Sequence, residues 1–306
     1  MKFSGIIPPM VTPLLGRDEL DRAGLERLIE RMVNAGVNGL FILGTTGEGP
    51  GLSYKLRREV IERTCRQVNG RIPVLVGITD TAFVESVSVA KVAADAGAEA
   101  LVAAPPYYMP EGQPELQEYL SHLLDELPLP LFIYNMPALT KVPFEVETVR
   151  WAVDQPRIIG LKDSSANMIY FHRALELARV RAGWPVLIGP EEMLFDAILA
   201  GGHGGVSGGA NLFPRLYVKL VEAARAGDLP RALQLHQAVL RVSGSLYRIG
   251  RHPSSIIKGI KCALACVGVC EDFLAEPFHR FRSEERMLVD IRVKELQAEL
   301  EGMGLA

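Results

Sequence analysis

The stretch IIGLKDSS, residues 158–165, is the one from which we expect the fold to follow. Its apolar residues form a short run typical of a strand buried in a parallel sheet, and Lys162 ends that run. Because side chains alternate along a strand, Ile158 and Gly160 are expected to share a face with Lys162. Ile159 is then expected on the opposite face, so the lysine would point into the interior of the sheet.

Two interpretations of this lysine are open at this point. A lysine removed from water loses its proton readily and becomes a nucleophilic amine. A lysine at a strand end can instead extend its ammonium group to solvent along an apolar stem. The rest of the sequence has to decide between them.

Composition limits the classes of function. The chain has 306 residues, of which 48% are hydrophobic and 23% charged, and its net charge is −3. It has no basic tract, so nucleic acid is not an expected partner. No apolar run approaches the ~20 residues that a membrane span needs, and the proline-interrupted N-terminus is unlike a signal peptide. We therefore expect a cytoplasmic protein with no membrane partner.

The four cysteines do not predict a metal site. Cys262, Cys266 and Cys270 are four residues apart, so they share one face of a helix, and Cys65 is remote in sequence. No histidine stands at ligand spacing beside them. We expect no metal and interpret the thiols as small buried side chains in a reducing compartment.

The chain alternates eight times between an apolar strand and a helical pattern. The first expected strand is short and ends in a rigid proline-flanked turn, both within residues 5–13. The other expected strands span residues 39–44, 73–78, 100–108, 131–137, 158–162, 185–192 and 204–209. This repeat is typical of a (β/α)8 TIM barrel of the α/β class. A doubly wound open sheet is the alternative, but no GxGxxG turn follows the first strand. We expect the barrel over residues 1–224 and a C-terminal helical appendage, containing three helices, over residues 225–306.

The carboxyl ends of barrel strands converge on one face, where active sites of this fold lie. Tyr134 and Lys162 end neighbouring strands about 4.8 Å apart, and both are expected to face inward, so their side chains can touch. Gly160 would leave room below the lysine. The same face would hold Thr45, Thr46, Tyr107, Tyr108 and Ser207.

Four motifs, each after its strand, resemble those of the dihydrodipicolinate synthase and N-acetylneuraminate lyase family of pyruvate-dependent class I aldolases. They are GTTGE (44–48), PPYY (105–108), YNMP (134–137) and GLKDSS (160–165), and the resemblance extends from residue 5 to about residue 280. It implies that Lys162 forms a Schiff base with pyruvate or another 2-oxo acid, so the nucleophilic interpretation is preferred. It also implies that no metal or organic cofactor is needed.

The resemblance implies roles for other residues as well. Tyr134 would transfer the proton, with its hydroxyl oriented by the Thr45 hydroxyl. Tyr108 would be contributed to the site by a neighbouring subunit of a homotetramer built as a dimer of dimers. Thr45 and Thr46 would hold the substrate carboxylate, with close backbone approach allowed by Gly44 and Gly47.

The glycine-rich segment at residues 201–209 has two possible functions. Barrels often build a phosphate site after strands seven and eight, and this segment has a composition compatible with one. We prefer a close-packed turn in which Val206 and Ser207 line the pyruvate pocket. Gly189, at the end of the seventh strand, is expected to border the same pocket.

The substrate is less well defined than the family. In dihydrodipicolinate synthases an arginine five residues after the tyrosine of the motif grips a second carboxylate, whereas this chain has Leu139 there, and leucine cannot form that pair. Glu191 and Glu192 resemble acidic residues that bind sugar hydroxyls in the lyases, although glutamates at a helix start also stabilise the helix dipole. Lys141 departs from the usual glycine and offers an alternative cation.

We therefore expect an enzyme that reversibly cleaves a 2-keto-3-deoxy sugar acid to pyruvate and an aldehyde, in the manner of an N-acetylneuraminate lyase or a 2-keto-3-deoxygluconate aldolase. The alternatives are a synthase that condenses pyruvate with aspartate semialdehyde and a Schiff-base dehydratase of a related acid. A non-catalytic sensor of 2-oxo acids would have no use for the combination of Lys162, Tyr134 and Thr45.

Overall fold

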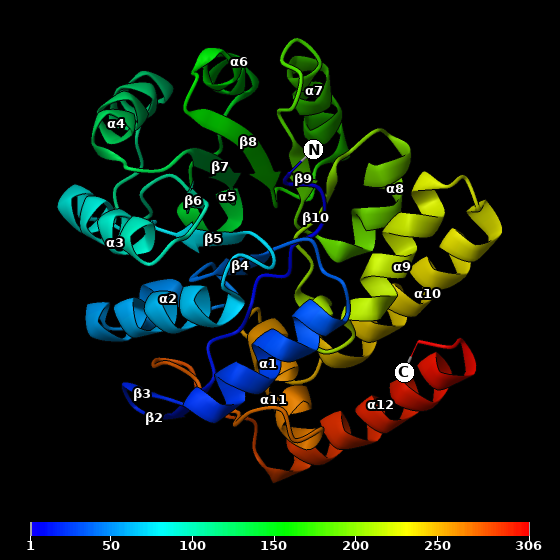
Figure 1. Cartoon of the computed structure of the whole chain (residues 1–306). Helices are drawn as coiled ribbons and strands as arrows, with labels where there is room; N and C mark the ends of the chain where they lie inside the picture. The colour runs from blue at the N-terminus through cyan, green and yellow to red at the C-terminus, as the bar shows by residue number, and fades with distance from the viewer. Residues whose placement is uncertain (1, 306) are drawn as a thin grey trace.

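Eight parallel strands form the centre of the molecule in a computed structural model that describes residues 2–305 (Figure 1). Their order around the sheet is β1, β10, β9, β8, β7, β6, β5, β4. The strands are β1 (Gly5–Ile6), β4 (Leu40–Ile42), β5 (Val74–Gly77), β6 (Ala100–Ala103), β7 (Leu131–Asn135), β8 (Ile158–Asp163), β9 (Val186–Ile188) and β10 (Gly204–Gly205).

The sheet closes into a barrel. On one side β1 pairs in parallel with β10. On the other side, the backbone after β1 pairs with β4: Phe41 N–H donates to Pro8 O at 3.0 Å and Met10 N–H donates to Phe41 O at 2.8 Å. The predicted TIM barrel is confirmed, and the open doubly wound sheet is wrong.

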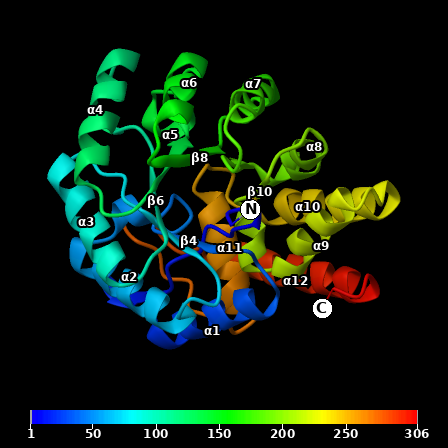
Figure 2. The same ribbon diagram turned by 45° about the horizontal axis from the view of Figure 1, so that its top comes forward.

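Helices surround the barrel and follow one another in chain order, as Figure 2 shows for one side of the ring. Side-chain caps begin two of them, α1 and α2: Asp21 accepts from Gly24 N–H, and Ser53 accepts from Leu56 N–H. These helices are α1 (Arg22–Asn34), α2 (Tyr54–Val68), α3 (Phe83–Asp95), α4 (Gln113–Glu126), α5 (Pro137–Thr140), α6 (Val146–Asp154), α7 (Met168–Ala178), α8 (Leu194–Leu199) and α9 (Pro214–Arg225), with the short 3-10 turns η1 (Gly49–Gly51), η2 (Glu191–Met193) and η3 (Gly208–Asn211).

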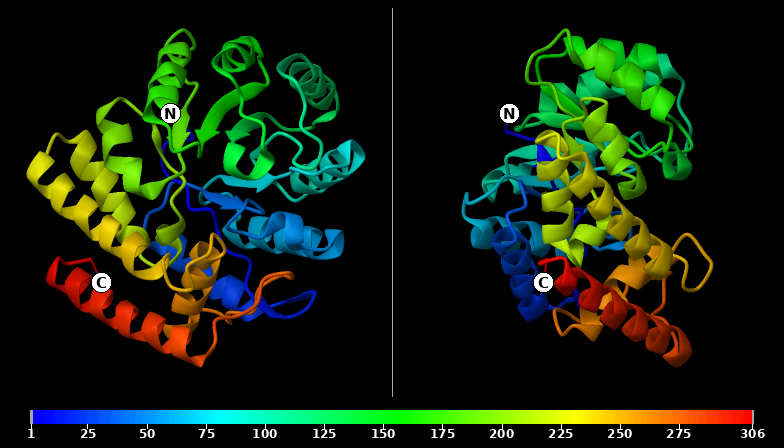
Figure 3. Two further views of the ribbon diagram at one scale, coloured as in Figure 1. Left: turned by 180° about the vertical axis from the view of Figure 1, so that it is seen from behind. Right: turned by 90° about the vertical axis from the view of Figure 1, so that its right-hand side faces the viewer.

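Three further helices follow the barrel, as predicted: α10 (Leu229–Leu246), α11 (Ser255–Cys266) and α12 (Ser283–Gly302). Figure 3 shows α12 running alongside α10 at the edge of the molecule, where Arg241 Nε donates to Glu299 Oε1 at 2.8 Å. No helix within residues 2–305 is long and apolar enough to cross a membrane.

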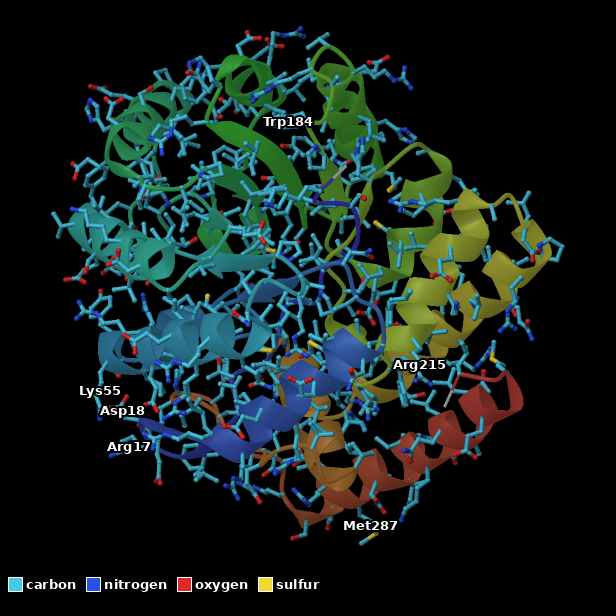
Figure 4. The ribbon with its side chains drawn as sticks, viewed as in Figure 1. Arg17, Asp18, Lys55, Trp184, Arg215 and Met287 are labelled. Atoms are coloured by element: carbon cyan, nitrogen blue, oxygen red, sulfur yellow. The ribbon has the colours of Figure 1, made fainter. Side chains whose placement is uncertain are left out.

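Two layers of apolar side chains make up the core. The outer layer lies between strands and helices and includes Trp184, labelled in Figure 4, whose indole N–H donates to Ile158 O at 2.9 Å. The inner layer fills the barrel, and Figure 4 shows side chains crowding this space. It contains Phe3, Ile7, Phe41, Leu75, Ala100, Val102, Ala104, Phe132, Tyr134, Leu187 and Val206.

The expected alternation along β8 is wrong at its first residue. Ile158 belongs to the outer layer, whereas Ile159 packs against the inner one. The cause is a register shift against β7: Leu131 pairs with Ile158, but the next residue, Phe132, pairs with Gly160. A bulge of this kind gives two residues on one strand opposite one on its partner, so the alternation restarts at Gly160.

The first barrel strand is short and ends before the prolines, as expected, whereas the last strand is shorter than expected. Prolines at 8, 9 and 13 lack the N–H that a strand donates, so the ladder of β1 ends at Ile6. The chain then forms an antiparallel pair that the sequence did not suggest, β2 (Leu14–Gly16) with β3 (Glu19–Leu20). The seam between β1 and β10 is very tight, because a Cβ on Gly204 would lie 2.0 Å from Gly5 O.

Candidate active site

Lys162 and Tyr134 meet inside the barrel as predicted. They are paired residues of the neighbouring strands β8 and β7, and each side chain is buried. Lys162 Nζ lies 3.5 Å from the centre of the Tyr134 ring and 5.2 Å from the centre of the Phe41 ring. The amine is therefore enclosed by aromatic faces, and the solvent-exposed alternative for this lysine is wrong.

This environment changes the acidity of the amine. Burial lowers the pKa of Lys162, because the charged form loses its hydration, while the neighbouring Tyr134 and Asp163 act in the opposite direction. The net lowering increases the fraction of neutral amine at a given pH. A neutral amine is the form that can attack a carbonyl carbon.

Gly160 was expected to leave room for Lys162, but the structure shows that it makes room for the Phe132 ring. A Cβ at this position would lie 2.4 Å from the Phe132 ring and 2.8 Å from Pro185 O. Both neighbours are held in the barrel wall, so no larger residue fits without movement. The glycine therefore lets Phe132 pack directly below the lysine.

Thr45 lies beside this pair, in the loop after the carboxyl end of β4. Its Oγ1 is 3.4 Å from the Tyr134 hydroxyl, within hydrogen-bond range. Among residues 2–305 the N–H groups of Thr45 and Thr46 have no hydrogen-bond acceptor. Two adjacent N–H groups and two hydroxyls at a barrel mouth can bind a carboxylate.

The loop that carries these threonines is shaped by more than its glycines. A Cβ on Gly44 would lie 2.5 Å from the Phe41 ring, and one on Gly47 would lie 2.9 Å from Met10 O, so both positions pack against the protein. Leu43 and Glu48 each have φ of +58°. A left-handed conformation is costly for residues other than glycine, by roughly 1–3 kcal/mol each, so the surrounding structure must hold this loop.

Asn135 and Asp163 lock the ends of the two strands that carry the central pair. Asn135 Nδ2 donates to Asp163 Oδ1 at 2.9 Å, and Asn135 Oδ1 accepts from Phe144 N–H at 3.0 Å. Asp163 also accepts from the N–H and the hydroxyl of Ser165. Asn135 follows Tyr134 in sequence, and Asp163 follows Lys162. This adjacency to the predicted pair is the signal by which the sequence could have identified both residues.

Ser164 is another residue that the sequence interpretation left without a role. Burial acts to raise the pKa of Tyr134, but the neighbouring Lys162, aided by the hydroxyls of Thr45 and Ser164, lowers this pKa below its ordinary value. A Cβ on Gly189 would lie 1.9 Å from Ser164 Oγ. Gly189 was predicted to border the substrate, and the structure places it where it makes room for this serine.

Val206 and Ser207 differ in the layer of the core that they face. Val206 belongs to the inner layer with Tyr134, as expected. A Cβ added to Gly205 would lie 2.6 Å from Leu194 of the outer layer and 3.1 Å from the Ser207 hydroxyl, so this hydroxyl lies on the outer side. The structure therefore brings Val206, and not the Ser207 hydroxyl, to the barrel interior.

Glu191 has a different environment from the one expected. Its carboxylate is buried and accepts from Gly209 N–H at 2.8 Å, from Tyr217 at 2.6 Å and from Tyr247 at 2.8 Å. It therefore joins η2 to η3, α9 and the end of α10. Burial raises its pKa to about 7, although all three donors favour the charged form. Glu192 is exposed beside it.

Three predicted residues lie on the surface near the carboxyl end of β7 or in the loop after β6. Leu139 is half-exposed on α5, and the Lys141 ammonium caps that helix by donating to Ala138 O at 3.2 Å. Tyr108 is 81% exposed and therefore does not reach the Tyr134 hydroxyl of its own chain.

A separate groove of about 990 Å³ lies between α1, α2, α9 and α12, and Arg215, labelled in Figure 4, is part of its lining. None of the predicted site residues lines it. The groove is therefore distinct from the part of the barrel interior where Lys162 and Tyr134 meet.

A TIM barrel that encloses an amine of lowered pKa beside a tyrosine defines the class: this is a class I, lysine-dependent lyase. The chain belongs to the dihydrodipicolinate synthetase family, whose sequence model matches residues 2–296. Members of this family act on pyruvate, so the chain is a pyruvate-dependent aldolase or synthase.

The chain resembles relatives that are named for different activities. A putative 2-dehydro-3-deoxy-D-gluconate aldolase of Escherichia coli K12 is 32% identical over 258 residues, which cover 84% of this chain and 85% of the relative. The solved dihydrodipicolinate synthase of Bacteroides thetaiotaomicron is 51% identical, with a TM-score of 0.93 over 95% of this chain and 98% of that one. An E. coli K12 prophage protein of the family, solved with pyruvate, is 29% identical, with a TM-score of 0.90 over 96% and 99%.

Proposed function

We propose that the enzyme reversibly cleaves a 2-keto-3-deoxy sugar acid to pyruvate and an aldehyde. The observation that carries this choice of substrate is Leu139, an apolar residue where the synthases carry a carboxylate-binding arginine. The nearby cation, Lys141, donates to a backbone carbonyl of its own helix. An uncharged polyhydroxy aldehyde is better suited to this surface than a second carboxylate.

In the proposed reaction, the neutral Lys162 amine attacks the C2 carbonyl of the sugar acid and water leaves, which gives a protonated Schiff base. Tyr134 then takes the proton of the C4 hydroxyl. The C3–C4 bond breaks, the aldehyde departs, and the bonding electrons move into the iminium to form an enamine. Protonation of C3 by Tyr134 and hydrolysis then release pyruvate and restore the lysine.

The other residues have supporting roles in this proposal. The N–H groups and hydroxyls of Thr45 and Thr46 hold the C1 carboxylate, and Thr45 also orients the Tyr134 hydroxyl. Val206 packs beside the bound pyruvate. Glu192, exposed near the end of β9, contacts a hydroxyl of the sugar chain. The chemistry uses no metal and no organic cofactor.

Tyr108 completes the proton relay from a neighbouring subunit, so the active form is a homo-oligomer, a dimer of dimers. The 81% exposure of Tyr108 in the single chain supports this assignment, because an isolated phenol on the surface has no function in its own site. Its neighbour Met109 is 70% exposed, which adds apolar surface for such a contact.

A dihydrodipicolinate synthase activity, condensing pyruvate with aspartate semialdehyde, is the second candidate. The 51% identity to the solved Bacteroides thetaiotaomicron protein of that name favours it. Both reactions pass through the same enamine, so the aldehyde that binds beside it is what distinguishes them.

Two experiments test the proposal. Borohydride reduction with pyruvate, followed by peptide mass mapping, should yield an adduct on Lys162, and an adduct on another residue would refute the assigned nucleophile. A panel of aldehydes with pyruvate then tests the substrate. We expect turnover of sugar aldehydes to exceed that of aspartate semialdehyde, and the reverse order would favour the synthase.

A further inference from the structure

The threonine loop is fixed by a residue from outside the barrel. Glu48, the last residue of GTTGE, turns its carboxylate away from the substrate side. Its Oε1 lies 2.8 Å from Nζ of Lys261 on α11, and its Oε2 accepts from Ala275 N–H at 2.7 Å. The loop is therefore bonded at its C-terminal end to two segments that follow the barrel.

Lys261 bonds to the segment under the loop as well. Its Nζ donates to Thr12 O at 2.7 Å, and the Thr12 hydroxyl donates to Gly47 O at 2.7 Å. The side chains of Lys261 and Glu48 are 0% and 2% exposed. Lys261 thus bonds to both Thr12 and Glu48, and these contacts form a closed set of hydrogen bonds around Gly47. We call this set of four residues the loop anchor (Thr12, Gly47, Glu48, Lys261).

The loop anchor sets the position of Thr45. Glu48 N–H donates to Thr45 O at 3.0 Å, so Thr45 and Glu48 form one tight turn. The Thr45 hydroxyl is at 3.4 Å from Tyr134, near the limit of a hydrogen bond. A small displacement of the turn would therefore break this contact and move the N–H groups of Thr45 and Thr46.

We propose that Lys261 and Glu48 are positioning residues, which hold Thr45 and Thr46 in the geometry that binds the 2-oxo acid carboxylate and orients Tyr134. This inference rests on the proposed Schiff-base chemistry. It assigns to α11 a part in the active site, although none of its residues contacts the reacting atoms. It also gives a reason for a buried ion pair that stability alone does not require.

The test uses pyruvate alone, so it does not depend on the aldehyde. Exchange of the pyruvate methyl protons in D2O, followed by NMR, reports the enamine step, and the pyruvate dependence of borohydride trapping reports affinity. For Lys261→Met we expect the pyruvate concentration that gives half-maximal trapping to be about tenfold higher than in the wild type. We expect the rate of proton exchange to be at least tenfold lower. Arg241→Met, which removes the α10–α12 ion pair, is the matched control and should leave both unchanged.

A second variant separates positioning from folding. Lys261→Met leaves an uncompensated buried carboxylate, whereas the double variant Lys261→Met/Glu48→Gln does not, so the double variant should melt closer to the wild type. We expect its affinity and exchange to stay reduced. Recovery of both to wild-type values in the folded double variant would overturn the inference.

Thr12→Val decides the question if neither variant folds, since it deletes only the hydroxyl bond to Gly47. We expect it to raise the pyruvate concentration for half-maximal trapping about threefold and to lower the melting temperature modestly, because Gly47 O loses its donor. Unchanged trapping would count against the loop anchor. Absence of any Lys162 adduct in the wild type would instead refute the proposed function.

Discussion

The amine of Lys162 is buried among aromatic rings, and this burial lowers its pKa. Because the lysine in the unfolded chain stays protonated to higher pH, the folded protein is less stable below the folded pKa and recovers stability as pH rises toward 10.5. The residue that makes the site reactive therefore destabilises the fold at neutral pH.

Lys162→Met should separate reactivity from stability. We expect pyruvate methyl exchange to fall roughly 10⁴-fold or more, as on loss of a nucleophile, while the melting temperature at pH 7 rises. Thermal melts followed by circular dichroism at pH 7 and pH 10.5 measure the difference in melting temperature between the variant and the wild type. This difference should be smaller at pH 10.5. A variant that melts below the wild type at pH 7 would show that the buried amine does not destabilise the fold.

Glu191 makes the stability of the fold depend on pH in the opposite direction from Lys162. Its pKa is raised to about 7 from an unfolded value of 4.5, so the folded state holds the proton more tightly. Stability should therefore fall as pH rises from 4.5 to 7, by on the order of 3 kcal/mol. We expect Glu191→Gln to flatten this slope in denaturant titrations at pH 5, 6 and 7.5. Glu192→Gln should retain most of it, because burial is the main cause of the raised pKa and the Glu192 charge adds less. Equal slopes for Glu191→Gln and the wild type would contradict the assignment.

At the scale of elements, we expect α5 to decide the aldehyde. Leu139 is 49% exposed at the carboxyl end of β7, so Leu139→Arg should change stability by less than about 0.5 kcal/mol. We expect unchanged trapping of pyruvate and a preference shifted about tenfold toward aspartate semialdehyde, since the guanidinium can pair with its carboxylate. Leu139→Gln, which adds polarity without charge, should not shift it. A shift of equal size in both variants would exclude carboxylate pairing as the cause.

The seam between β1 and β10 should tolerate no side chain. Gly204 has φ of +155°, and an added Cβ would meet backbone atoms of Gly5 that cannot move aside. We expect Gly204→Ala to lower the free energy of unfolding by roughly 3 kcal/mol or more. Gly244→Ala, in α10 with open space around the added Cβ, should raise it by about 0.5–1 kcal/mol. Urea titrations compare the two, and similar destabilisation by both would contradict the role of the seam.

The sequence predicted the elements whose signals are local. Tyr134 and Lys162 each end a short apolar strand, so their meeting followed from alternation and from the barrel rule. The bulge at Ile158 was not predictable, because it is a property of the pairing with β7 and not of either strand alone. The Glu48 contact was missed for a related reason: its partner Lys261 stands 213 residues away in sequence.

The whole molecule extends the site beyond the barrel. Glu48 is bonded to α11, and Glu191 is bonded to Tyr217 on α9 and to Tyr247 at the end of α10. The C-terminal helices therefore support the loops at the barrel mouth and are more than an appendage. In the proposed relay the remaining residue, Tyr108, is exposed and needs a second copy of the chain to reach a catalytic lysine.

Subunit complementation tests that requirement. Tyr108→Phe keeps the ring at the interface but removes the hydroxyl, and Lys162→Met removes the nucleophile, so each variant alone should show little pyruvate exchange. In a mixed dimer, one site combines Lys162 from the first variant with Tyr108 from the second. Reassociation of equal amounts should restore about a quarter of wild-type exchange, because half of the dimers are mixed and half of their sites are complete.

The outcome shows whether Tyr108 acts in the active site of a neighbouring subunit or in that of its own chain. If Tyr108 serves its own chain, mixing cannot assemble a complete site, and exchange stays at the level of the separate variants. Light scattering on the same samples gives the oligomeric state, and a fully active monomer would remove the need for a lent tyrosine. Recovery that appears only after dissociation and reassociation would show that the 81% exposed phenol becomes part of a neighbour's proton relay.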